Sequence, residues 1–180
     1  MANKIRIAVL SGGWSKERGV SINSGKAVLG ALDKGKYEIV SFDPKHDLNV
    51  LWQQRHALDL VFSVLHGKYG EDGRIQGLLE VFGIPFVGSG VLSSAMAMNK
   101  RLTKEVYRSV GLRVPKDIIL KKKQAVSLDK IKDMLGTPVV IKPVSEGSSI
   151  GISIMENDRD ILAGIEKAFG FDQEILLEEY

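Results

Sequence analysis

The sequence contains no cysteine among its 180 residues. Disulfide bonds and cysteine-based zinc sites are therefore excluded. No apolar stretch reaches the length of a membrane-spanning helix, and the first strand begins at Ile5 without the charged and then apolar segment of a secretory signal. We therefore expect a cytoplasmic protein without a membrane partner.

The chain also lacks a strong excess of charge and is poor in aromatic residues. Its net charge is +3, and aromatic residues make up 7% of it. The only dense basic run is 121–123, whereas nucleic-acid binding usually requires a basic stripe with interleaved aromatic residues. We expect no nucleic-acid partner. The hydrophobic content of 44% is ordinary for a globular protein, and 180 residues allow one large domain or two small ones.

Short apolar strands alternate with helices in the first half of the chain. The pattern predicts strands at 5–10, 37–42, 58–65 and 84–87, and helices at 20–32 and 74–82. This alternation favours a doubly wound α/β unit with a parallel sheet. Ligands bind such sheets at the carboxyl ends of the strands. The glycine-rich loops 11–13 and 67–73 are both expected there.

The pattern changes after Gly90. It predicts helices at 91–110, 127–135 and 158–169, strands at 117–120, 139–142 and 174–180, and a returning strand with Ile150, Ile152 and Ile154 on one face. Antiparallel strands flanked by helices indicate a small α+β subdomain. We place the domain boundary between residues 92 and 93. Because the sequence stops inside its last predicted strand, we expect the chain to be truncated.

Lys142 is the one charged residue in the apolar run that precedes Pro143. A lysine among valines and isoleucines carries a desolvation penalty unless an anion offsets it. The following turn, 146–149, offers backbone N–H groups, two hydroxyls and a flexible glycine. This combination suits a polyphosphate. An edge strand whose lysine extends to water explains the same pattern, and the run alone does not decide between the two.

Two polar residues lie near the ends of strands in the expected parallel sheet. Glu17 lies just before a predicted helix. Its carboxylate there either interacts favourably with the helix dipole or binds an ammonium group, and its spacing alone favours the first interpretation. His66 has no second histidine nearby and is a poor metal candidate. Its position directly after a strand favours a hydrogen bond to a ligand over a buried structural role. The loop 11–17 does not match G-x-G-x-x-G, which argues against a dinucleotide site of that kind.

The other candidate residues have ordinary explanations when each is taken singly. Lys100 would be a solvated helical lysine, and Ser148 and Ser149 would be turn residues. Glu178 and Glu179 would form the exposed end of a strand.

Five ordered blocks of the sequence together resemble the D-alanine–D-alanine ligase family of the ATP-grasp superfamily. They are GGWSKERGVSINSG (12–25), HGKYGEDGRIQGLLEVFGIPFVGSG (66–90), SAMAMNKRLTK (94–104), VVIKPVSEGSSIG (139–151) and LLEEY (176–180). The resemblance implies an α/β fold. A parallel-sheet pre-ATP-grasp domain for substrate binding would occupy 1–92, and the small α+β subdomain of an ATP-grasp fold would occupy 93–180, with the second ATP-grasp subdomain absent.

This family uses ATP and magnesium to join two D-alanines through a D-alanyl phosphate, which gives D-alanyl-D-alanine for peptidoglycan. The resemblance implies that Glu17 binds the ammonium group of the first D-alanine and that Val20 lines its pocket. His66 would lie near this substrate and the acylphosphate. Lys100 and Lys142 would hold the phosphates of ATP.

The resemblance also assigns roles to the loop and to the last strand. Ser148 and Ser149 would close over the phosphates, with Ser148 joined by hydrogen bonds to Glu17. The catalytic set would then be Glu17, Ser148 and His66. Glu178, with the backbone around Glu179 and Tyr180, would begin the adenine-binding hinge.

Other features of the family are expected outside this chain. They are the magnesium ligands, the oxyanion-stabilising arginine and most of the second D-alanine site. We therefore expect no metal site here, an inactive chain when it is alone, and a homodimer for the full-length enzyme.

Asn99 stands where the family commonly has aspartate, and we expect this departure to be tolerated. The alternatives are a D-alanine–D-lactate-type or other ATP-grasp carboxylate–amine ligase, or a noncatalytic fragment.

Overall fold

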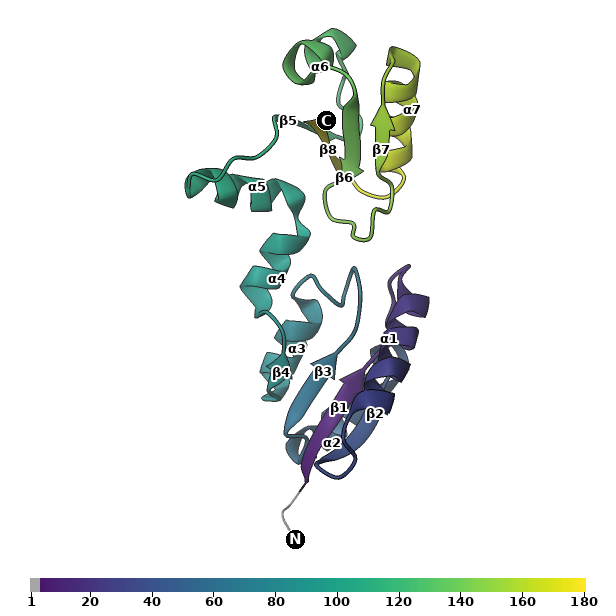
Figure 1. Ribbon diagram of the computed structural model, residues 1–180, viewed down its shortest axis with the longest axis vertical. Helices are drawn as coiled ribbons and strands as arrows, with labels where there is room; N and C mark the ends of the chain where they lie inside the picture. The colour runs from purple at the N-terminus through teal and green to yellow at the C-terminus, as the bar shows by residue number, and fades with distance from the viewer. Residues whose placement is uncertain (1–3) are drawn as a thin grey trace. The chain divides into compact units, whose positions relative to one another are not determined.

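The computed structural model describes residues 4–180, which divide into two compact units (Figure 1). The first unit ends at Ala95, and the second runs from Met96 to Tyr180. The expected division between residues 92 and 93, with a substrate-binding role for the first part and an ATP-grasp role for the second, stays a prediction.

The first unit contains a four-stranded parallel sheet in the order β2-β1-β3-β4. Its strands are β1 (Ile5–Leu10), β2 (Tyr37–Phe42), β3 (Leu60–Ser63) and β4 (Phe86–Val87). Its helices are α1 (Arg18–Ala31), α2 (Pro44–Gln54), a 3-10 turn (Arg55–Ala57) and α3 (Arg74–Phe82). The next helix, α4 (Val91–Met98), begins in the first unit and ends in the second. The prediction of an α/β unit built on a parallel sheet is confirmed.

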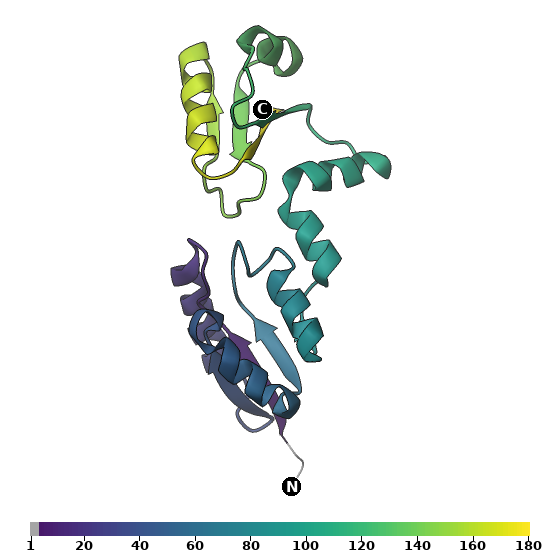
Figure 2. The same cartoon turned by 180° about the vertical axis from the view of Figure 1, so that it is seen from behind.

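The helices of the first unit cover the sheet through small and apolar side chains. Leu51 of α2 and Leu79 of α3 share one buried cluster with Leu10, and α2 lies behind the sheet in Figure 1 and in front of it in Figure 2. Successive strand residues point to opposite faces, so Val9 faces away from this cluster. β2 and β3 lie on opposite sides of β1, so the order of the strands reverses between β1 and β3. A crevice for a ligand is expected at this point of a doubly wound sheet.

The second unit contains a four-stranded antiparallel sheet in the order β5-β8-β6-β7. Its strands are β5 (Asp117–Lys121), β6 (Val139–Pro143), β7 (Ser153–Met155) and β8 (Glu174–Glu179), and its helices are α5 (Lys100–Ser109), α6 (Leu128–Leu135) and α7 (Asp158–Phe169). One face of the sheet packs on α6 and α7 through residues such as Ile141 and Leu177. Alternation places Asp117, Lys142 and Glu178 on the other face. The predicted α+β subdomain is confirmed.

The single helix predicted for 91–110 is wrong, because the chain forms two helices that meet at Asn99. The Asn99 side chain accepts a hydrogen bond from the Leu102 N–H at 3.0 Å and so caps α5. The Lys100 N–H donates to the Val144 carbonyl, also at 3.0 Å. A new helix therefore begins at Lys100, and its first residue is tied to the end of β6.

The helix α2 was not predicted. Its start carries a recognisable signal, because Asp43 caps it and Pro44 occupies the first turn. Its apolar content is low, and its buried residues are Pro44 and Leu51. Hydrophobic periodicity therefore gives almost no signal for this helix.

Three further sequence interpretations are corrected. β3 and β7 are shorter than the predicted strands, and Ile154 is 53% exposed while Ser153 is buried, so the proposed isoleucine face is wrong. β6 lies between β8 and β7, which contradicts the edge-strand explanation of Lys142. Glu178 is buried, which contradicts its explanation as an exposed strand end.

Candidate functional site

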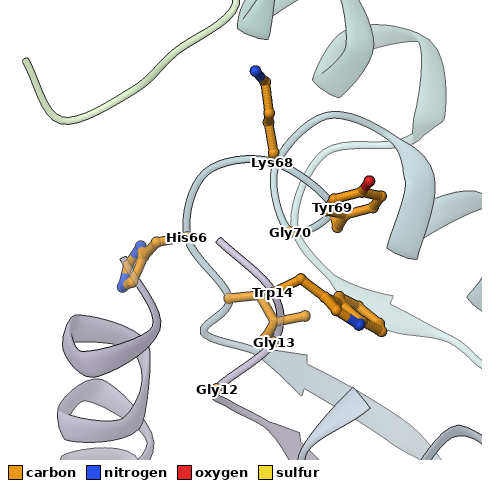
Figure 3. A pocket seen from close by; sticks show the side chains of 8 residues that line it. Gly12, Gly13, Trp14, His66, Lys68, Tyr69 and Gly70 are labelled. Carbon is orange, nitrogen blue, oxygen red and sulfur yellow. The ribbon is translucent and has the colours of Figure 1, made fainter. Parts of the chain in front are cut away.

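A pocket lies in the first unit where the loops after β1 and β3 meet (Figure 3). It is lined by Gly12, Gly13, Trp14, Leu65, His66, Lys68, Tyr69 and Gly70. This is the point where the strand order reverses, which agrees with the expectation that both glycine-rich loops lie at the carboxyl edge of the sheet. The Trp14 and Tyr69 rings, one from each loop, lie 5.5 Å apart.

Ser21 on α1 joins the two loops from a fully buried position. Its hydroxyl accepts a hydrogen bond from the Gly12 N–H at 2.8 Å and donates to the Val64 carbonyl at 2.7 Å. One turn later, Gly25 passes so close to Ser11 that an added methyl group would lie 2.6 Å from the serine side chain. A small residue and a buried hydroxyl therefore set the position of α1 against both loops.

We expect Ser21→Ala to lower the free energy of unfolding by about 1–3 kcal/mol, because it leaves two backbone groups without their partner. Both tryptophans of this chain, Trp14 and Trp52, lie in the first unit. Urea unfolding followed by their fluorescence therefore reports this unit. Ser41→Ala, at an exposed serine of β2, is the matched control. A loss no larger than that of the control would contradict the bridging role.

Asp43 fixes the outer side of the first loop. Its carboxylate accepts hydrogen bonds from the Gly13 N–H at 2.9 Å and the Lys45 N–H at 3.1 Å, and it pairs with Arg18 at 2.5 Å. Burial by itself raises the pKa of Asp43, but these hydrogen bonds outweigh it and the net shift of the pKa is downward. The carboxylate therefore stays charged and keeps the Gly13 turn in place at neutral pH.

Glu17 is buried immediately before α1, and its carboxylate lies against the second loop. A methyl group added to Gly67 would lie 2.5 Å from Oε2 of Glu17, and Gly67 has a φ of 66°, which favours glycine. The structure thus places a buried carboxylate next to the backbone that follows His66. Such a group can orient a cationic ligand through charge-assisted hydrogen bonds.

His66 is half-buried, and its ring points toward α1 (Figure 3). Its Nε2 lies 3.3 Å from the hydroxyl of Ser24, a partner that the sequence analysis did not identify. Val20, predicted to line the substrate pocket, is 57% exposed on α1. The roles proposed for Glu17, Val20 and His66 stay predictions.

In the second unit, Lys100 reaches the loop after β6. Its Nζ lies 3.5 Å from the Val144 carbonyl and donates a short hydrogen bond to the Glu146 carbonyl. Burial lowers the pKa of Lys100, and the positive charge of Lys142 lowers it further, against the opposing effect of nearby carboxylates. Lys100 and Lys142 are thus close enough to repel each other. An anion that contacts both would relieve this repulsion.

Lys142 itself pairs with the buried carboxylate of Glu178. Its side chain is 21% exposed, whereas that of Glu178 is 8% exposed. The lysine is therefore the member of the pair that a ligand in solution can reach.

The loop between β6 and β7 has an unusual backbone. Ser148 and Ser149 are both exposed and have φ values of 47° and 59°, in the left-handed region that residues with a side chain seldom adopt. Each such residue costs about 1–3 kcal/mol and is found most often at ligand-binding and switch segments. The hydrogen-bond network expected between Ser148 and Glu17 stays a prediction.

The last strand places its acidic residues differently from one another. The buried Glu178 carboxylate pairs with Lys142, whereas the Glu179 carboxylate accepts a hydrogen bond from the Lys116 N–H at 2.8 Å and so holds the segment before β5. Tyr180 is 78% exposed. Their assignment to an adenine-binding hinge stays a prediction.

Lys142 and Glu178 belong to a larger charged cluster, whose other members, Lys104, Asp117 and Arg108, were not predicted from the sequence. Lys104 pairs with Glu178 at 2.5 Å and with Asp117 at 2.9 Å, and Arg108 also pairs with Asp117. A signal was present in the sequence, because Lys100, Lys104 and Arg108 recur every four residues. In a helix this spacing puts three cations on one face.

No group of three or more histidine, aspartate or glutamate side chains that could hold a metal ion occurs in residues 4–180. Within the same range, no helix is long and apolar enough to cross a membrane.

Comparison with known proteins gives consistent matches. The family model "D-ala D-ala ligase N-terminus" matches residues 42–89, and "D-ala D-ala ligase C-terminus" matches residues 106–180. Together they cover more than half of the chain. The D-alanine–D-alanine ligase of Syntrophobacter fumaroxidans is 48% identical over 177 residues, which are 98% of this chain and 57% of that protein. The chain thus spans little more than half the length of the curated relatives it matches.

Solved structures agree. The D-alanine–D-alanine ligase from Bacillus anthracis complexed with ATP is 39% identical, with a TM-score of 0.87 over 98% of this chain and 58% of that one. The VanG D-Ala:D-Ser ligase from Enterococcus faecalis is 33% identical, with a TM-score of 0.82, and the match covers 99% of this chain and 63% of that one. The fold is that of the ATP-grasp superfamily. The chain belongs to the D-alanine–D-alanine ligase family, as its ordered sequence blocks predicted.

Proposed function

We propose that this chain supplies the first D-alanine site and part of the nucleotide site of a D-alanine–D-alanine ligase. The reaction would consume ATP and two D-alanines and release ADP, phosphate and D-alanyl-D-alanine, a precursor of peptidoglycan. The observation that carries this proposal is the position of two lysines at the loop after β6, in a chain whose family is that of the ligases: Lys100 binds the Glu146 carbonyl of this loop, and Lys142 lies at the end of β6.

The proposed chemistry begins with binding and orientation. In the first unit, the buried Glu17 carboxylate would hold the ammonium group of the first D-alanine, and His66 would lie beside that substrate. In the second unit, Lys100 and Lys142 would neutralise the phosphates of ATP. Phosphoryl transfer depends mainly on such charge neutralisation and positioning.

The substrate carboxylate would attack the terminal phosphorus of ATP and form D-alanyl phosphate with release of ADP. The amine of the second D-alanine would then attack the acyl carbon, and phosphate would leave as the peptide bond forms. Water would hydrolyse the acylphosphate, so the intermediate has to be shielded. The strained loop with Ser148 and Ser149 is our candidate for that shield.

The test is D-alanine-dependent release of ADP, with the dipeptide identified by mass spectrometry. The protein would be expressed with any sequence that its gene carries beyond residue 180, beside residues 1–180 alone. We expect turnover from the preparation that includes any sequence beyond residue 180. Because the chain spans 57% of its relative, we expect ATP binding without turnover from residues 1–180 alone. Failure of both preparations to bind ATP would refute the proposal and favour a noncatalytic fragment.

The main alternative to this proposal is a ligase whose second substrate is not D-alanine. The similarity to a D-Ala:D-Ser ligase favours testing D-serine, and D-lactate would be included for the same reason. We propose D-alanine because identity to the D-alanine–D-alanine ligase of Syntrophobacter fumaroxidans is higher, at 48% against 33%. A dipeptide or depsipeptide formed faster with another second substrate would overturn this choice.

Three further features of the proposed enzyme rest on the family resemblance alone. They are magnesium bound by residues beyond this chain, a homodimer, and a cytoplasmic location without nucleic-acid or membrane partners. Gel filtration of the whole protein and the dependence of turnover on magnesium test the first two.

A further inference from the structure

Lys104 is a buried lysine whose ammonium group lies against three oxygen atoms. Its side chain is 8% exposed. Its Nζ lies 2.8 Å from the Pro115 carbonyl, 2.5 Å from Oε1 of Glu178 and 2.9 Å from Oδ1 of Asp117. The ammonium group donates hydrogen bonds to the first two of these oxygens and forms an ion pair with Asp117, so its charge is already neutralised inside the protein.

The two carboxylates that Lys104 contacts stand opposite each other. Asp117 on β5 and Glu178 on β8 are direct partners in the antiparallel register. Like charges at such positions repel each other and destabilise a sheet. Lys104 lies between them, while Arg108 pairs with the outer side of Asp117 and Lys142 pairs with Oε2 of Glu178. The cluster therefore alternates in charge along its length.

Lys142 has two competing roles in this arrangement, as a partner of Glu178 and as the proposed ligand of ATP phosphates. It can move toward a phosphate only if the buried Glu178 keeps another cation, since an unpaired buried charge is strongly unfavourable. Lys104 is that second cation, on the other carboxylate oxygen. We propose that Lys104 is a positioning residue that neutralises Glu178 from the buried side and so makes Lys142 available to the nucleotide.

This role rests on the proposed nucleotide-binding function. Without Lys104, Glu178 would retain Lys142 as its only charged partner in the cluster, and the lysine would be held away from the phosphates. The expected defect is thus one of ATP affinity that depends on Glu178. A purely structural role for Lys104 would lower stability without this dependence.

The experiment measures the dissociation constant of ATP by calorimetry in the whole protein, with any sequence beyond residue 180. The variants are Lys104→Met, Glu178→Gln and the double variant. We expect Lys104→Met to weaken ATP binding about tenfold or more in the wild-type background, and less than about threefold in the Glu178→Gln background, since coupled neighbours are non-additive. Lys104→Arg, which keeps the charge, should restore the affinity to within about threefold of wild type.

The matched control is Lys130→Met, at an exposed lysine of α6, which should leave ATP affinity unchanged. Equal losses from Lys104→Met in both backgrounds would overturn the proposal, as would a folded Lys104→Met protein with wild-type affinity. If Lys104→Met does not fold, the double variant decides: affinity equal to that of Glu178→Gln supports the proposal, and a further tenfold loss overturns it. A wild-type protein that does not bind ATP would instead refute the proposed function itself.

Discussion

Replacing Lys142 with methionine is expected to lower kcat/KM for ATP by about 100-fold or more. The reason is the loss of a positive charge from a water-poor site where phosphate charge has to be neutralised. Methionine keeps most of the length of the lysine side chain, and Glu178 keeps its contact with Lys104, so the fold should persist. The KM for D-alanine should change little, since the proposed role of Lys142 is to hold the phosphates of ATP and does not involve the D-alanine ammonium group.

The measurement is steady-state release of ADP at varied ATP and at varied D-alanine, on the whole protein. Lys121→Met is the control, because this lysine lies in the same sheet and its side chain is 72% exposed. ATP kinetics in Lys142→Met that match those of the control would remove Lys142 from the nucleotide site. A thermal melt of each variant separates loss of folding from loss of binding.

Glu17→Gln is expected to have the second large effect, on the other substrate. The amide keeps the shape of the side chain but removes the charge, and a hydrogen bond to a charged group contributes about 1.5–3 kcal/mol. We therefore expect kcat/KM for D-alanine to fall about 10-fold to 100-fold. The affinity for ATP should remain within about twofold of wild type, as no part of the proposed role of Glu17 involves the nucleotide.

Calorimetry with ATP and kinetics with D-alanine together test this selectivity. Glu80→Gln, at an exposed position of α3, serves as the control for the same chemical change. An equal loss for both substrates would mean that Glu17 holds the loops in place and does not orient the amine.

Hydrophobic periodicity predicted the strands and helices with clear apolar patterns. β1, β2, α3 and α7 have the predicted bounds, because each has a distinct run or stripe and an ordinary end signal. Hydrophobic periodicity did not predict the structure where helix caps and tertiary hydrogen bonds determine it. α2 depends on its cap at Asp43 more than on apolar residues, and the break at Asn99 depends on a side-chain cap and on a tertiary hydrogen bond to Val144. Such a tertiary bond leaves no periodic signal in the sequence.

Prediction of the candidate site from the sequence was limited in the same way, because tertiary contacts leave no local pattern. Isolated sequence patterns left Lys142 undecided and favoured a helix-dipole role for Glu17, whereas the ordered blocks supplied their proposed ligand-binding roles. Neither approach found Lys104 or Ser21, because their importance comes from contacts with residues far away in the chain. The recurrence of cations on α5 was visible, but its meaning depends on which sheet residues lie opposite that face.

The position of β8 also has a consequence for biosynthesis. β8 pairs with both β5 and β6, yet it follows them in the chain, and the contact between Lys116 and Glu179 spans 63 residues. During translation the strands of the first unit all precede Ala95 and can pair early. In the second unit, β5 and the inner edge of β6 stay without their partner until β8 leaves the ribosome. Contacts of this range form slowly, and unpaired strand edges are prone to aggregation. A nascent chain paused before residue 174 would therefore display a folded first unit and a second unit still in need of protection by chaperones.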